Sequence, residues 1–160
     1  MTTTDAVITR ITQAVTDFRA DATDTTRAVL LDLWTEIGVA GDPLHRCTLA
    51  HYLADAYDDP AEALVWNVRA LDAADALTDA RVHDHHAGLR VAGFYPSLHL
   101  NLADDFRRLG AFPAATRHLT AATTHLHTLP DDDYGTMIRR ALTEVTAAVT
   151  ANDTTPRPTP

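Results

Sequence analysis

A short segment occurs twice in the chain, and this internal repeat constrains the fold more than any other feature of the sequence. The first copy, His51–Tyr57, has the sequence His-Tyr-Leu-Ala-Asp-Ala-Tyr, and the second, Leu100–Phe106, has the sequence Leu-Asn-Leu-Ala-Asp-Asp-Phe. A helix breaker and an alanine-rich segment follow each copy. Repeated pairs of helical segments are typical of proteins built from stacked hairpins, because one hairpin cannot bury its apolar face alone.

Glycine and proline divide the sequence into segments of helical periodicity. Apolar residues recur at helical spacing within residues 5–18, 30–37, 43–58, 60–77, 98–109, 113–126 and 138–149, and a shorter polar helix is expected within 79–91. No alternating β pattern occurs in the sequence. Segments joined by turns of a few residues must lie antiparallel, so we expect an all-α fold of stacked antiparallel helix hairpins with about seven or eight helices.

The length and composition predict one helical domain followed by a tail. Residues 1–150 fit a single domain with a core of its own. Residues 151–160 are rich in threonine and proline, and we expect them to be disordered because such a segment has little to pack. The three acidic residues Asp131–Asp133 precede the last helix and are interpreted as its N-cap rather than as a calcium site.

The second copy resembles a tetratricopeptide repeat. The matching positions are Leu102, Ala103 and Phe106 in the first helix, Gly110 at the turn, and Ala115, Leu119 and Ala122 in the second helix. The first copy keeps Leu53, Ala54 and Tyr57, but its Ala63 comes early, and the copies are separated by more than the family's spacing of about 34 residues. The resemblance implies a superhelix of the tetratricopeptide-repeat type.

The same resemblance implies a peptide-binding groove, because the first helix of each hairpin lines such a groove in this family. Carried over residue by residue, the groove positions are Thr48, His51, Asp55, Ser97, Leu100, Asn101, Asp104 and Arg108. One variant of the family holds a peptide carboxylate with lysine, arginine and asparagine, but this chain contains no lysine and has Asp55 and Asp104 in the groove. The resemblance therefore implies a non-enzymatic module that binds a protein or peptide partner, and the acidic groove suits a cationic one.

Charge and composition narrow the remaining function classes. The net charge of −9 would repel nucleic acid, so we expect no nucleic-acid partner. No apolar run approaches the roughly 18 residues that a bilayer span needs, so we expect no membrane partner. The single cysteine, Cys47, has no partner for an intramolecular disulfide, and residues 1–19 do not have the pattern of a signal peptide. These features together predict a cytoplasmic protein.

A second hypothesis is a small-molecule-binding or metal-binding helical protein that uses His51 with Asp55, and that hypothesis includes an enzyme. These residues lie one helical turn apart, as do Cys47 and His51, and a carboxylate next to an imidazole can orient a general base. The cluster His83, His85 and His86 provides half of a metal site at most. We assign no catalytic residue, metal or cofactor, and leave open a homodimer formed through an exposed apolar edge, as well as a purely structural subunit.

Overall fold

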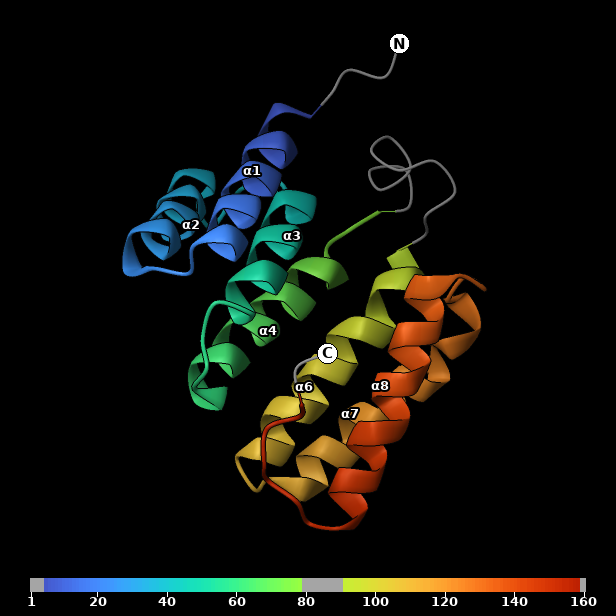
Figure 1. Cartoon of the computed structure of the whole chain (residues 1–160). Coiled ribbons are helices and arrows are strands. Elements are labelled where there is room, and N and C mark those ends of the chain that lie inside the picture. Colours follow the sequence, from blue (N-terminus) through green and yellow to red (C-terminus); the bar gives the residue numbers. More distant parts are fainter. Residues whose placement is uncertain (1–4, 79–90, 159–160) are drawn as a thin grey trace. The chain divides into compact units, whose positions relative to one another are not determined.

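The computed structural model describes residues 5–78 and 91–158, and every regular element in these two ranges is helical (Figure 1). The α-helices are α1 (Ala6–Ala20), α2 (Asp24–Ile37), α3 (Pro43–Ala54), α4 (Pro60–Asp75), α6 (Tyr95–Arg108), α7 (Phe112–Thr124) and α8 (Asp133–Thr150). Short 3-10 helices cover Val91–Phe94 and Leu126–Thr128. The predicted all-α fold of antiparallel helix hairpins is confirmed, whereas the polar helix expected within 79–91 falls almost wholly outside the described residues.

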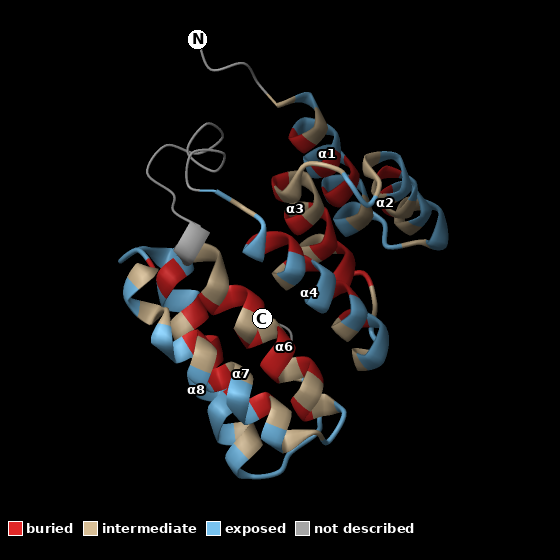
Figure 2. Ribbon diagram, turned by 180° about the vertical axis from the view of Figure 1, so that it is seen from behind, coloured by how far each residue is buried: buried red, intermediate tan, exposed pale blue. Residues whose placement is uncertain are grey.

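The chain divides into two compact units, Met1–Val91 and Ala92–Pro160, where the sequence predicted a single domain over residues 1–150. The first unit contains α1 to α4, and the second contains α6, α7 and α8. Each unit has buried residues of its own along the inner faces of its helices (Figure 2). We therefore describe each unit by itself.

Local signals in the sequence set the helix boundaries of the first unit. The Asp42 carboxylate accepts a hydrogen bond from the Leu44 amide at 2.8 Å, and Pro43 occupies the first turn of α3. The Asp59 carboxylate caps α4 in the same way. Proline suits these positions because its missing N–H would have no helical partner there. Gly38 has a φ of 74° and ends α2, because glycine adopts this left-handed region without a steric cost.

The core of the first unit is formed mainly by α3 and α4 together with α1 and α2. Leu53 and Ala54, from the first copy of the repeat, are buried on α3. Trp34 of α2 meets Trp66 of α4 edge to face, with ring centroids 5.1 Å apart. Tyr57 is half-buried just beyond α3. Leu53 and Ala54 of the first copy are therefore packing residues of this unit.

The second unit is a hairpin of α6 and α7 with α8 packed against both helices. Its core contains Leu100, Ala103, Leu119, Ala122, Leu129, Ile138, Ala141, Leu142 and Val145. Gly110, with a φ of 76°, forms the turn between α6 and α7. Asp132 caps α8 by accepting a hydrogen bond from the Gly135 amide, which confirms the capping interpretation of the acidic run.

The start of α6 differs from the prediction. The predicted segment began at Leu98, but α6 begins at Tyr95, so Pro96 lies in its first turn. Proline is tolerated there for the same reason as in α3 and α4. None of the helices in the described ranges is both long and apolar enough to cross a membrane.

Candidate functional site

The three groove residues predicted on the first unit follow one another along α3 and its end. Thr48 and His51 are half-buried on α3, and Asp55 is the exposed C-cap residue. The His51 ring lies 5.7 Å from the Tyr52 ring, measured between centroids. Successive turns of one helix therefore present a hydroxyl, an imidazole and a carboxylate.

Desolvation shifts both ionisable members of this set towards their neutral forms. It lowers the pKa of His51, an effect that attraction to Asp55 opposes and repulsion from Arg19 reinforces. It also raises the pKa of Asp55, although that residue keeps exposed surface, while the charges of His51 and Arg19 act in the opposite direction. A neutral imidazole next to a carboxyl group can accept a proton, so acid–base chemistry is compatible with these residues but is not indicated by them.

Cys47 does not extend this set to a metal site. Its side chain is buried, and desolvation raises the pKa of the thiol to about 12. Metals bind the thiolate, so a thiol that stays protonated at neutral pH is a poor ligand. Within the described ranges, no group of three or more potential ligands from histidine, cysteine, aspartate and glutamate is arranged to hold a metal ion. His83, His85 and His86 lie outside those ranges.

The five groove residues predicted on α6 have different surroundings from one another. Leu100 is a core residue that is only 3% exposed, so its expected groove position is corrected to the interior of the unit. Ser97 is also buried, and its hydroxyl donates a hydrogen bond to the Phe94 carbonyl oxygen. Asn101, Asp104 and Arg108 are half-buried. Because the α3 and α6 residues lie in separate units, a groove shared by both sets stays a prediction.

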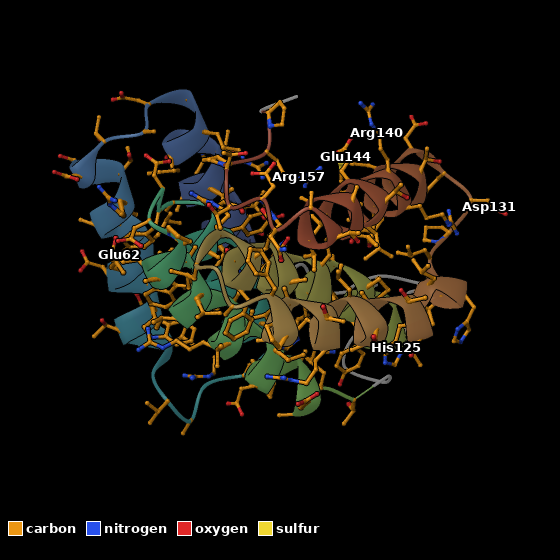
Figure 3. The ribbon with its side chains drawn as sticks, turned by 90° about the horizontal axis from the view of Figure 1, so that it is seen from below. Glu62, His125, Asp131, Arg140, Glu144 and Arg157 are labelled. Carbon is orange, nitrogen blue, oxygen red and sulfur yellow. The ribbon has the colours of Figure 1, made fainter. Side chains whose placement is uncertain are left out.

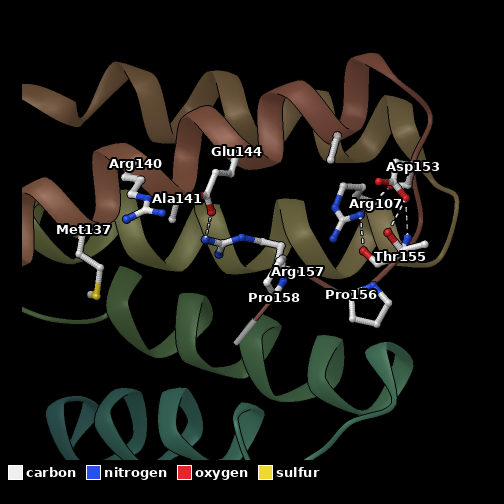
Figure 4. A pocket seen from close by; sticks show the side chains of 11 residues that line it. Arg107, Met137, Arg140, Ala141, Glu144, Asp153, Thr155, Pro156, Arg157 and Pro158 are labelled. Atoms are coloured by element: carbon white, nitrogen blue, oxygen red, sulfur yellow. Dashed lines mark hydrogen bonds and ion pairs between the residues drawn. The ribbon is translucent and has the colours of Figure 1, made fainter. Parts of the chain in front are cut away.

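The most constrained polar group of the second unit is Arg107, which is not among the predicted site residues. Its side chain is fully buried. Nε and Nη2 donate hydrogen bonds to Oδ1 of Asp104 at 2.9 and 2.7 Å. Nη1 donates to the main-chain oxygens of Asp153 and Thr155 at 2.6 and 2.8 Å (Figure 4). Arginine suits this position because its planar guanidinium presents several donors in fixed directions.

The accepting carbonyls belong to the segment Asn152–Pro158, which we call the tail segment. We expected disorder here, but the structure describes these residues, and they lie against α6 and α8. Asn152 has a φ of 52° at the end of α8, and the Asp153 amide donates to the Ala148 carbonyl oxygen at 2.9 Å. This pattern is a Schellman turn, which reverses the chain after a helix.

The side chain of Arg157 links the tail segment to α8. Its Nη2 donates to Oε2 of Glu144 at 2.6 Å, and Nε of Arg140 donates to Oε1 of the same carboxylate at 3.0 Å (Figure 3). Hydrogen bonds from Arg157 and Arg140 lower the pKa of Glu144, so this carboxylate stays charged at neutral pH. An arginine of the tail is therefore held by a helix carboxylate.

A pocket of about 570 Å³ separates part of the tail segment from α8 (Figure 4). The helices contribute Arg107, Met137, Arg140, Ala141, Glu144 and Ala148, and the tail contributes Asp153, Thr155, Pro156, Arg157 and Pro158. Met137 is 56% exposed and offers a flexible apolar surface at this site. The tail segment thus leaves a considerable part of the surface along α8 uncovered.

Histidines form another cluster in the second unit that the sequence did not reveal. The Nδ1 atoms of His99 and His118 are 3.0 Å apart, and Phe106 stacks on His118. His125 stacks on Tyr95, with centroids 5.0 Å apart. A hydrogen bond between two Nδ1 atoms needs one of them unprotonated, so the pair shares a proton and cannot carry two charges while the bond lasts. Desolvation and the nearby Arg117 lower the pKa of His118.

One sequence signal pointed to Arg107. Ala103 follows Leu100 by three residues and Arg107 follows Ala103 by four, so the three side chains lie on the same face of α6. A charged residue therefore occupies the buried face of this helix. The tail contact had no comparable signal, because Arg107 and Thr155 are separated by 48 positions in the chain.

Comparison of the chain with models of known protein families, with curated proteins and with solved structures gives no significant match.

Proposed function

We propose that the chain is a non-enzymatic binding module that holds an extended segment of a partner protein against α6 and α8 of its second unit. The observation that carries this proposal is the contact between buried Arg107 and two main-chain oxygens, those of Asp153 and Thr155. Main-chain carbonyls occur in every peptide, so these donors recognise an extended backbone rather than one sequence.

The Arg107–Asp104 pair is suited to this task because its geometry is fixed in advance. Two hydrogen bonds to the Asp104 carboxylate hold the guanidinium plane, which leaves Nη1 directed at the bound backbone. A donor that is already ordered loses little conformational entropy when a ligand binds. Burial also strengthens each hydrogen bond, because little water competes for the donor.

The expected preference for a cationic partner takes a specific form in this proposal. The Asp104 carboxylate is neutralised by Arg107, so it adds little attraction for a cation. Glu144 is 41% exposed and binds Arg157 of the tail segment, so it is the carboxylate that meets a cationic side chain. We propose that the protein is cytoplasmic and has a protein partner. We propose no nucleic-acid partner, because the net charge of −9 opposes phosphate binding.

The alternative of a metal-dependent or catalytic site around His51 is less well supported. The buried and protonated thiol of Cys47 would have to lose a proton whose pKa is about 12. The resemblance to tetratricopeptide repeats at Leu102, Ala103 and Phe106 supports the binding proposal, and the first two of these residues are buried.

A selection experiment tests the proposed function. The full chain is immobilised and a library of displayed peptides is selected against it, and enriched peptides are then measured against the wild type and against Asp104→Asn. The variant keeps the shape of the side chain but removes the charge that orients Arg107, so we expect at least tenfold weaker binding. The exposed Arg117→Ala on α7 is the matched control and keeps wild-type affinity. Failure to enrich any peptide, or equal affinity for Asp104→Asn, would refute the proposal.

A further inference from the structure

We propose that the tail segment is a displaceable occupant of the peptide site, and that the partner segment replacing it carries an arginine with a larger apolar residue beside it. This inference rests on the proposed function and adds the class of the partner and its regulation. Three features of the second unit support it: the turn at Asn152, the pair of contacts at Arg107 and Glu144, and the pocket along α8.

The contacts that hold the tail segment are ones that a separate chain can make equally well. Arg107 binds two main-chain oxygens of the tail segment, and Glu144 binds the side chain of Arg157 in that segment. Pro156 and Pro158 flank that arginine, and proline has no N–H, so at these positions the segment offers carbonyls but no donors. Proline also favours an extended conformation, which limits the entropy lost on binding. The tail segment therefore has the chemistry of a peptide ligand.

The connection to α8 makes the tail segment easy to release. Asn152 adopts a left-handed conformation that costs non-glycine residues some stability, although asparagine tolerates it better than most. The ion pair of Arg157 with Glu144 is also accessible to water, with side chains 33% and 41% exposed. Exposed pairs of this kind contribute little to stability. A partner in a separate chain does not need the strained turn.

The pocket along α8 indicates how a partner improves on the tail segment. The space of about 570 Å³ lies between tail residues and Met137, Arg140, Ala141, Glu144 and Ala148. Thr155, Pro156 and Pro158 line this space without filling it, and Met137, which also lines it, is 56% exposed. A partner with a leucine or an aromatic residue next to its arginine would cover this surface, and burial of such a side chain favours binding.

Tethering adds to the contacts at Arg107 and Glu144 in favour of the tail segment. A short connection to α8 gives it an effective concentration in the millimolar range, so it occupies the site unless a partner binds more tightly. Any change that weakens the tail contact without altering the site should therefore strengthen binding of an added peptide. Two residues allow this test, because Arg157 and Asn152 both follow the last helix and contribute nothing to the helical core.

The experiment measures a labelled synthetic peptide with the sequence of residues 152–158, Asn-Asp-Thr-Thr-Pro-Arg-Pro, against full-length proteins. Arg157→Ala should bind it about fivefold more tightly than the wild type, which corresponds to about 1 kcal/mol. Asn152→Ala should act in the same direction, because it raises the cost of the turn. Arg117→Ala, an exposed arginine on a helix that does not line the pocket, should leave the affinity unchanged. Circular dichroism confirms that each variant keeps its helices.

Peptide variants test the class of partner in the same assay. Replacing the peptide's arginine by alanine should weaken binding to Arg157→Ala about fivefold. Replacing the last peptide proline, the counterpart of Pro158, by leucine should strengthen binding, because Pro158 lies nearer to Met137 than Pro156 does (Figure 4). Equal affinity of the tail peptide for wild type, Arg157→Ala and Asn152→Ala would overturn the competition. Absence of binding to any of them at millimolar concentration would overturn the tail as a ligand, whereas the library selection would still judge the proposed function separately. A concentration-dependent dimer in light scattering would assign the site to the tail of a second copy instead of a foreign partner.

Discussion

Replacing Arg107 by lysine tests whether geometry or charge alone holds the second unit and its tail together. Both side chains are cationic, but lysine has one nitrogen where arginine has three. Arg107 uses Nε and Nη2 for Asp104 and Nη1 for the oxygens of Asp153 and Thr155. A single ammonium group cannot serve both sides of this arrangement, so Arg107→Lys loses about half of four hydrogen bonds.

The size of the loss follows from burial. Hydrogen bonds to charged groups contribute about 1.5–3 kcal/mol each, and Arg107 is fully buried. Part of the loss is recovered because the Thr155 region is exposed and its carbonyl regains water. We therefore expect Arg107→Lys to lower the free energy of unfolding by about 2–4 kcal/mol. Arg107→Ala also leaves Asp104 without its counter-charge, and we expect a loss of about 3–5 kcal/mol.

Urea titration followed by far-UV circular dichroism measures these changes in both units. Trp34 and Trp66 are the only tryptophans and lie in the first unit, so their fluorescence reports on that unit separately. Arg117→Ala, on the surface of α7, should change stability by less than about 0.5 kcal/mol. A double-mutant cycle with Asp104→Asn should be non-additive, since the two residues share hydrogen bonds. Wild-type stability of Arg107→Lys would refute the argument that donor geometry matters here.

Three further predictions concern other parts of the molecule. Cys47 should react with a thiol reagent only after denaturation, because it is buried and its pKa is raised to about 12; rapid labelling of the native protein would contradict this. Gly135→Ala should lower the free energy of unfolding by about 1–3 kcal/mol, because the Cβ of the new alanine would lie 1.9 Å from the Pro130 carbonyl oxygen. An unchanged urea midpoint would contradict this prediction, because it would show that the backbone at Pro130 moves aside at no cost. The pKa of His118 should lie below 6.5 in an NMR pH series, and Arg117→Ala should raise it. The free energy of unfolding should fall as the pH falls below 6.5, because this histidine binds a proton more readily in the unfolded chain than in the folded one. A His118 pKa at or above 6.5 in the wild type would contradict the expectation.

The helices themselves were largely predictable because their signals are local. Asp42 with Pro43, Asp59 with Pro60, and Gly110 each act within one turn of the chain, so their effect does not depend on the rest of the fold. Periodicity placed Leu53 and Leu102 on buried faces in the same way. The predicted segment 98–109 left out Pro96, because proline breaks a helix in its interior, whereas in α6 it lies in the first turn.

The groove residues were harder to predict because a face of a helix is defined only by what packs against it. The spacing of polar residues on α6 suggested that Leu100 and Asp104 face an open groove. In the structure, Leu100 packs into the core with residues of α7 and α8, and the Asp104 carboxylate forms an ion pair with Arg107. The sequence contains Arg107 on an apolar stripe, yet it does not say which distant group receives the charge.

The sequence by itself determined that this chain forms helices, where most of them begin and end, and which faces are apolar, because these properties depend on residues within a few positions of one another. Only the tertiary structure decided that Arg107 points inward to hold the tail and that His99 meets His118. These contacts join residues that are distant in sequence, and their free energy depends on burial that no local pattern records.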